Sequence, residues 1–262
     1  MNAPTAVSTE VHDGGGMLEV VIAVPKGNVL TQAVMREIDR ALETHAPSPP
    51  LRMVLIRAEG KHFSFGASIE EHRREQVREM LSTFHALVRR VARFPVPVVA
   101  MVQGKCLGGA FELALACHLV LATDDAVFSC PEIKLGVIPP VLAALGPSRL
   151  GACVAERLLY TGGDLDAHAA LAAGFAAQVV PRDANLANVW TEYYRTHFAP
   201  LSAHAIRHAV RAVRSGNAFD NAVDAGLTAA EERYLAHIVP SHDGNEGIEA
   251  FLSKRAPVWS HA

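Results

Sequence analysis

Short apolar runs alternate with amphipathic stretches over the first half of the chain. Four runs of mainly apolar residues predict strands at 18–24, 52–57, 98–102 and 118–122. Thr31 is placed to cap a helix with an apolar stripe at Val34, Met35, Ile38, Ala41 and Leu42, and a charged amphipathic stretch predicts a longer helix at 69–93. Apolar strands separated by helices predict an α/β fold with a layered core.

The two ends of the chain differ from this pattern. The first 16 residues end in three glycines and predict a frayed terminus, with order beginning at Met17. From residue 151 onward the pattern is mostly helical, with one short strand at 176–180. We therefore expect a core at 1–195 and a helical extension at 196–262 that packs on a neighbouring subunit.

Composition and charge limit the kinds of partner that the protein can bind. The chain has 262 residues, half of them hydrophobic, which is enough for a sizeable core. Its net charge is -3 and its lysines and arginines are dispersed, so no nucleic-acid or membrane partner is expected. The longest apolar run, 111–122, is too short to span a bilayer, and no signal peptide opens the chain. These features predict a cytoplasmic protein with a small-molecule ligand.

Cysteines and histidines give no metal signature. The four cysteines lack a CxxC spacing and are interpreted as buried thiols in a reducing compartment. His204 and His208 have the i, i+4 spacing of a zinc helix, but the adjacent glutamate and a third ligand are missing. We expect no metal.

Two glutamates lie in mainly apolar stretches. Glu112 follows a Gly-Gly turn, and Glu132 follows Pro131. A carboxylate is costly to bury unless something uses or satisfies it, so both are candidates for chemistry. The structural alternatives are a helix-dipole role for Glu112 and a solvated position for Glu132.

Two loops could supply hydrogen-bond donors to a developing negative charge. The turn at Gly108 and Gly109 enters a helix whose first N–H groups lack internal partners, and the loop at 63–68 offers the N–H of Ala67. Converging donors of this kind stabilise an oxyanion by about 3 to 4 kcal/mol each. Either signal alone is weak, since a Gly-Gly before a helix is common turn chemistry.

Segments 61–70, 98–117 and 128–139 together resemble the enoyl-CoA hydratase/isomerase (crotonase) superfamily, from about residue 17 to the C-terminus. Gly109 precedes Glu112 by three residues, and 20 residues separate Glu112 from Glu132, as in the two-glutamate hydratases. The resemblance implies a crotonase-like layered fold (ββα superhelix), oxyanion donors at Ala67 and Gly109, and catalysis by both glutamates without deciding which activates water. An isomerase needs only one glutamate.

The resemblance also implies a coenzyme A thioester as substrate, with no separate cofactor. By analogy Lys26 and Lys254 meet phosphates and Phe251 packs near the adenine. The implied substrate-binding residues are Lys26, Val29, Phe65, Gly66, Ser68, Val137, Val141, Phe251 and Lys254. Family resemblance further implies a homo-trimer or hexamer. His62, His72 and Cys130 are weaker candidates for the pocket.

Departures from the common family pattern bear on the substrate. Ser68 stands where an aspartate is usual, and bulkier apolar residues follow Gly136. The loop at 63–72 most closely resembles the cyclohexa-1,5-diene-1-carbonyl-CoA hydratases of anaerobic benzoyl-CoA degradation, which implies 1,4-addition of water to give 6-hydroxycyclohex-1-ene-1-carbonyl-CoA. Alternatives are a generic enoyl-CoA hydratase for linear or monounsaturated cyclic acyl groups, a thioester or C–C hydrolase, and a non-catalytic RNA- or protein-binding module. The last would need neither both glutamates nor this spacing, and should show a basic stripe.

Overall fold

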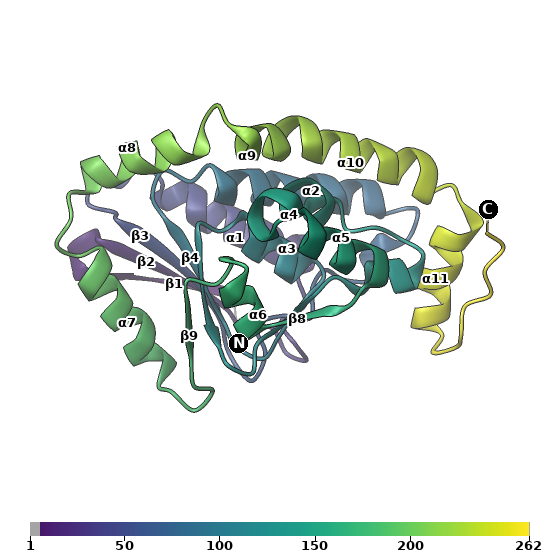
Figure 1. The fold of residues 1–262 in the computed structure, drawn as a ribbon, viewed down its shortest axis with the longest axis horizontal. Helices are drawn as coiled ribbons and strands as arrows, with labels where there is room; N and C mark the ends of the chain where they lie inside the picture. Colours follow the sequence, from purple (N-terminus) through teal and green to yellow (C-terminus); the bar gives the residue numbers. More distant parts are fainter. Residues whose placement is uncertain (1–5, 262) are drawn as a thin grey trace, which may run out of the picture.

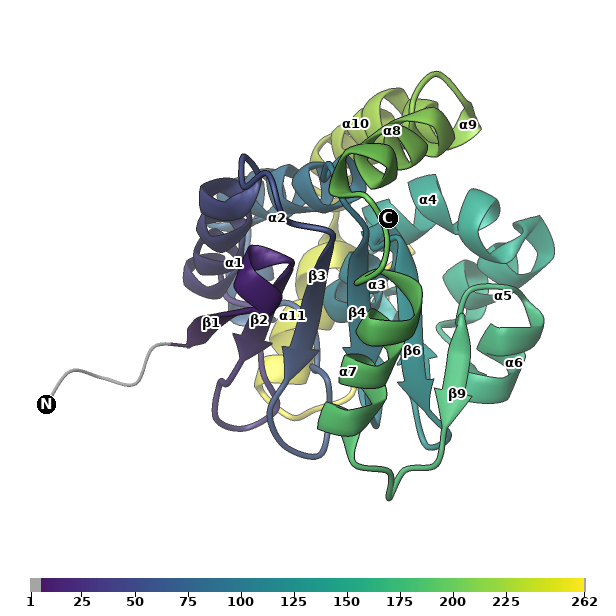
Figure 2. The same cartoon turned by 90° about the vertical axis from the view of Figure 1, so that its left-hand side faces the viewer.

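The computed structural model describes residues 6–261 and contains one large mixed sheet (Figure 1). Its strands lie in the order β1 (Val7–His12), β2 (Met17–Ile22), β3 (Met53–Ala58), β4 (Val98–Val102), β6 (Leu119–Thr123) and β9 (Gln178–Val180). Figure 2 shows this order across the sheet. β1 is antiparallel to β2, and the other neighbours are parallel.

A smaller sheet carries the loops that matter for function. β5 (Lys105–Leu107) is parallel to β7 (Val127–Ser129), which is antiparallel to β8 (Asp164–Asp166). A single bridge from Ser64 to Cys106 ties the loop before Ala67 to β5, and another joins Ala67 to Leu30. β5 comes directly before the turn at Gly108 and Gly109 that the sequence indicated.

Helices cover the sheets and extend beyond them. The helices are α1 (Gln32–His45), α2 (Val77–Ala92), α3 (Gly109–Ala116), α4 (Pro140–Leu150), α5 (Ala152–Thr161), α6 (Ala167–Ala172), α7 (Leu186–His197), α8 (Ala203–Arg214), α9 (Ala218–Asn221), α10 (Leu227–Arg233) and α11 (His242–Leu252). Three short 3₁₀ turns that border the loops lie at 13–15, 70–72 and 131–135, and π-helical turns lie at 222–226 and 234–238. Figure 1 shows α8 to α10 following one another along one side, with α11 at the end far from the large sheet.

The core explains why parallel strands form here. Every residue of β2 and β4 is buried, as expected for strands covered on both faces. All eight residues of α3 are buried too, so this helix lies inside the molecule with Glu112 on it. The α/β class and the helical C-terminal part are confirmed. In the described residues, no helix is long and apolar enough to cross a bilayer.

Several predicted elements are confirmed and one helix is corrected. The Thr31 hydroxyl accepts the N–H of Val34 and caps α1 as expected. The helix predicted at 69–93 is wrong at its start, because α2 begins at Val77. The Glu71 carboxylate instead accepts the N–H of Gln32 at 2.9 Å, which draws the segment before α2 onto the first turn of α1.

The expected frayed terminus is wrong for residues 7–16. Val7–His12 forms β1 and pairs with β2 through backbone hydrogen bonds. An edge strand can be mostly exposed, as β1 is, so an apolar sequence is not required. Residues 1–5 lie outside the described residues. The division at residue 195 stays a prediction, and it falls inside α7. Of the cysteines, Cys153 is exposed, which corrects the expectation of four buried thiols.

Candidate active site

A cavity of about 640 Å³ lies among the loop after β3, the turn before α3, the 3₁₀ turn at 131–135 and α11. Its wall is mainly apolar, with a few polar groups, as in sites for organic ligands. The lining residues are Val29, Phe65, Ala67, Ile69, Glu70, His72, Lys105, Leu107, Gly108, Pro131, Glu132, Lys134, Leu135, Val137 and Phe251.

The backbone nitrogens of Ala67, which lines this cavity, and of Gly109 lie close together. A Cβ atom placed on Gly109 would lie 3.3 Å from the nitrogen of Ala67. Gly109 is the first residue of α3, so its N–H has no partner inside the helix. Among residues 6–261, neither N–H has a backbone acceptor. Two free donors on adjacent loops can hold an oxyanion.

Glu112 is buried and tied to the start of the next helix. Its Oε1 accepts the N–H groups of Val141 and Leu142, at 2.7 and 3.0 Å, in the first turn of α4. Burial raises the pKa of Glu112 to about 7, and these two N–H donors oppose the shift. The donors and the helix N-terminus both favour the ionised form.

Glu132 opens onto the cavity and has fewer stabilising partners. It follows Pro131 at the start of the 3₁₀ turn, and its Oε2 is buried without a hydrogen-bond partner in the described residues. Burial raises the pKa of Glu132 to about 8, and the charge of Glu112 adds to the shift. The two carboxyl groups are therefore close enough to interact, and Glu132 is the one that holds a proton more strongly.

Several other predicted residues also border the cavity. Val29, Phe65, Val137 and Phe251 line it. Lys26 instead lines a neighbouring cleft of about 530 Å³ that shares Phe65.

Three further predicted residues are not among those that line the cavity. Val141 contributes its N–H to Glu112 and its side chain is buried. Gly66 lets the loop approach β5, since a Cβ there would lie 2.5 Å from the Leu107 carbonyl oxygen. Lys254 follows α11 with a left-handed backbone, and the residues found to line the cavity do not include it. Their binding roles stay predictions.

Ser68 organises the polar part of the wall. Its hydroxyl donates to Glu70 at 3.0 Å, and its carbonyl oxygen lies 2.7 Å from Nδ1 of His72. Glu70 and His72 both line the cavity. Burial lowers the pKa of His72, so the ring is neutral and donates from Nδ1. From the sequence, His72 was only a weaker pocket candidate and Glu70 was not a candidate, because both positions depend on the 3₁₀ turn that replaces the expected helix.

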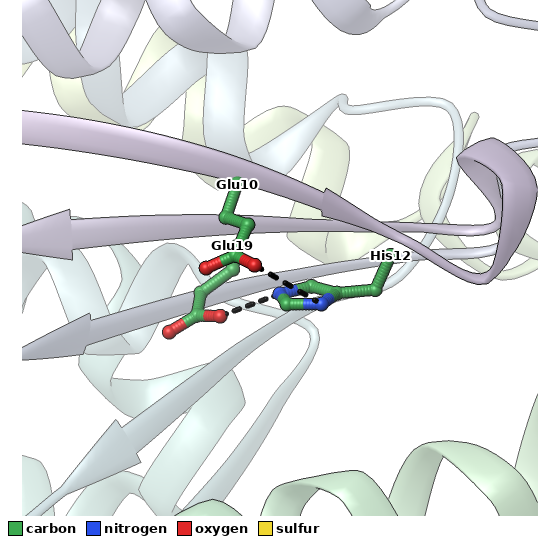
Figure 3. Close-up of side chains that lie close together, drawn as sticks. All are labelled: Glu10, His12 and Glu19. Carbon is green, nitrogen blue, oxygen red and sulfur yellow. Dashed lines mark hydrogen bonds and ion pairs between the residues drawn. The ribbon is translucent and has the colours of Figure 1, made fainter.

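A second cluster of titratable groups lies elsewhere, on β1 and β2 (Figure 3). His12 contacts Glu19 at 2.7 Å and lies 3.8 Å from Glu10. The buried carboxylate of Glu19 also accepts a hydrogen bond from Arg57. Since Glu19 is already satisfied by these two partners, the cluster is read as structural. The rings of His204 and His208 on α8 are tilted by 59° to each other, with centroids 4.6 Å apart.

Comparisons with known proteins agree with this geometry. The enoyl-CoA hydratase/isomerase family model matches residues 13–262. The cyclohexa-1,5-dienecarbonyl-CoA hydratase of Thauera aromatica is 39% identical over 94% of both chains. The 2,3-dehydroadipyl-CoA hydratase of Escherichia coli K12 is 32% identical over 88% of this chain and 89% of its own. A crystal structure of an enoyl-CoA hydratase from Mycobacterium avium subsp. paratuberculosis K-10 covers 98% of this chain and 99% of its own, with 31% identity and a TM-score of 0.84.

The chain therefore belongs to the enoyl-CoA hydratase/isomerase family and has the crotonase fold. Its hydratase relatives make it a hydro-lyase that acts on an acyl-CoA, which favours an enzyme over a non-catalytic binding module.

Proposed function

We propose that this hydratase adds water to cyclohexa-1,5-diene-1-carbonyl-CoA and forms 6-hydroxycyclohex-1-ene-1-carbonyl-CoA, in the anaerobic degradation of benzoyl-CoA. The observation that carries the proposal is the 39% identity to the Thauera aromatica enzyme of that activity, over nearly the whole of both chains. The 2,3-dehydroadipyl-CoA hydratase of Escherichia coli K12 has a lower identity, 32%. The apolar wall at Ile69, Leu107 and Val137 also suits a compact ring.

The thioester carbonyl oxygen binds between the N–H groups of Ala67 and Gly109. Water attacks the β-carbon of the ring, and the electron pair moves through the conjugated system onto that oxygen as a dienolate. The two N–H donors stabilise this negative charge until the dienolate is protonated on carbon. The addition is completed when a proton is delivered to the far carbon of the diene.

The two glutamates divide the proton transfers. Glu112 is the base that takes a proton from water, because the N–H groups of Val141 and Leu142 favour its ionised form. Glu132 is the acid, because burial and the charge of Glu112 keep it protonated and outweigh the hydrogen bonds from its own backbone N–H and from Cys130. A pair that shares one proton can thus supply a base and an acid at neutral pH.

Substrate profiling tests the proposal. The purified protein is incubated in ¹⁸O-water with the cyclic dienoyl-CoA, cyclohex-1-ene-1-carbonyl-CoA and crotonyl-CoA, and products are separated by mass. We expect the highest kcat/KM for the diene and ¹⁸O on the carbon next to the thioester-bearing carbon. Rapid hydration of crotonyl-CoA with an unchanged diene would instead support a generic enoyl-CoA hydratase.

We further propose that the protein acts in the cytoplasm as a homo-trimer or hexamer, with the part from residue 196 onward in the subunit contacts. Large apolar side chains are exposed on this part, including Leu201 and Val213, which supports burial between copies. Light scattering coupled to size exclusion measures the mass in solution against the 28.0 kDa chain. A monomer would contradict this proposal without affecting the chemistry.

A further inference from the structure

Two arginines from other helices bind the carboxyl end of α3. The carbonyl oxygen of Cys117, directly after α3, accepts hydrogen bonds from Arg149 at 3.0 Å and from Arg214 at 3.1 Å. Arg214 also donates to the carbonyl oxygen of Ala116 at 3.4 Å. Arg149 lies in the last turn of α4, and Arg214 lies in the last turn of α8. Three helices therefore meet here, at the opposite end of α3 from the oxyanion donor Gly109.

Neither of these guanidinium groups has an acidic partner, although both are shielded from water. Arg214 is 8% exposed, and Nε of Arg149 is buried without a hydrogen-bond partner in the described residues. The ion pairs found among residues 6–261 involve other arginines. Burial lowers the pKa of both groups, to about 10 for Arg214, so both stay charged at neutral pH. Because a buried charge without a counter-charge is costly, another negative group must balance these two.

The dipole of α3 supplies this negative charge. All eight residues of α3 are buried, so water does not screen the partial negative charge at its carboxyl end. The carbonyl groups of Ala116 and Cys117 form that end, and the two guanidinium groups neutralise it. At the amino end, about 12 Å away for a helix of this length, the N–H of Gly109 keeps its partial positive charge.

The same contacts fix the position of α3 along its own axis. The first turn of α4 binds the carboxylate of Glu112, in the middle of α3. The last turn of α4 binds Cys117 through Arg149, and α8 adds Arg214 at the same carbonyl. Since both Gly109 and Glu112 lie on α3, these contacts also place the oxyanion donor and the proposed base.

We propose that Arg149 and Arg214 are positioning residues for the oxyanion site. Their charges neutralise the carboxyl end of α3, so that its amino end stabilises negative charge on the thioester oxygen more strongly. Neither residue touches the substrate, and both act through α3. One unit charge about 12 Å from the oxyanion changes the rate about tenfold at the screening usual inside proteins. This inference rests on the proposed oxyanion chemistry, but not on the ring substrate.

The test separates the charge of each arginine from its bulk. Arg149→Met and Arg214→Met remove the charge, whereas Arg149→Lys and Arg214→Lys keep it, and the exposed Arg211→Met on α8 is the control. The first readout is kcat with whichever of the cyclic dienoyl-CoA and crotonyl-CoA the wild type hydrates. The second is the carbonyl stretching frequency of bound butyryl-CoA, labelled with ¹³C at the thioester carbonyl. This frequency falls as hydrogen-bond donors polarise the carbonyl.

Each Met variant should lose about tenfold in kcat and bind butyryl-CoA within about threefold of the wild type. Its carbonyl frequency should move toward that of the free thioester. Each Lys variant should retain kcat within about threefold, and Arg211→Met should change neither readout. Urea denaturation shows whether each variant is folded. Where a Met variant unfolds, glutamine replaces it with the same expected loss, because glutamine is neutral but still donates a hydrogen bond.

Unchanged kcat and carbonyl frequency in the Met variants would overturn the role of the two arginines. Lys variants as slow as the Met variants would overturn it too, because the arginines would then act through packing and not through charge. A wild type that binds butyryl-CoA without lowering its carbonyl frequency would contradict the oxyanion site and the proposed function with it. A lowered frequency that the Met variants retain would contradict this inference alone.

Discussion

Gly108 leaves the space in which the carboxyl group of Glu132 lies. A Cβ atom at position 108 would be 2.7 Å from Oε1 of Glu132, and the backbone there has a φ of +52°. The glycine that enters α3 therefore serves the second glutamate as well as the oxyanion turn.

Gly108→Ala should displace Glu132 and lower kcat about 100-fold, the lower range for loss of a general acid. The positive φ should also cost about 1 kcal/mol of unfolding free energy. Gly60→Ala is the matched control, because Gly60 has a φ of +88° and nothing within 4 Å of an added Cβ. It should show the same loss of stability in urea denaturation with full activity. Unchanged activity in Gly108→Ala would show that Glu132 does not need this position.

The rate of hydration should depend on pH in a bell shape. As pH falls through about 7, Glu112 gains a proton and stops acting as a base. As pH rises through about 8, Glu132 loses the proton that it donates. The apparent values belong to the interacting pair. Initial rates from pH 5.5 to 9.5 should therefore have a narrow maximum, and a flat profile over this range would rule out the shared proton.

The same groups should make the fold less stable as pH rises. Unfolded Glu132 ionises near 4.5, whereas the folded group holds its proton up to about 8, so its contribution to stability is full below 4.5 and is lost as pH approaches 8. Glu132→Gln removes this loss and should be more stable than the wild type by about 1 kcal/mol at pH 8.5. The difference should shrink near pH 4.5. The exposed Glu75→Gln serves as control, and an equal effect there would contradict the assignment.

The closeness of α11 to the cavity can be tested at Gly247. A Cβ on Gly247 would lie 2.0 Å from the carbonyl oxygen of Leu135, which lines the cavity. Gly247→Ala should cost about 2 kcal/mol of unfolding free energy and raise KM, because α11 must shift away. Gly226→Ala, which meets only ordinary contacts at 3.6 Å, should be nearly neutral. Normal stability of Gly247→Ala would mean that α11 packs differently in solution.

The sequence predicted the parts of this fold that local pattern determines. β4 lies at 98–102 as expected, because its apolar run has a proline before it and a glycine soon after. The start of α2 could not be predicted, since Glu71 binds α1 instead of continuing a helix. β1 was missed because an exposed edge strand carries little apolar signal.

The residues of the site also divide into those that the local sequence predicts and those whose position depends on tertiary packing. The spacing from Gly109 to Glu112 is local and could be read directly, and family resemblance supplied the pairing of Glu112 with Glu132 and of Gly109 with Ala67. Glu70 and His72 have no such local signal, because their place in the cavity wall depends on the 3₁₀ turn at 70–72.

The most direct test of the account is the hydration rate of Glu112→Gln and Glu132→Gln, measured with the dissociation constant for butyryl-CoA. Glutamine keeps an oxygen that can accept the N–H groups of Val141 and Leu142, so Glu112→Gln should preserve the local fold. We predict that each variant loses about 1,000-fold in kcat and binds butyryl-CoA within about threefold of the wild type. A variant that retains kcat within threefold would contradict the assignment of paired proton transfer to these two residues.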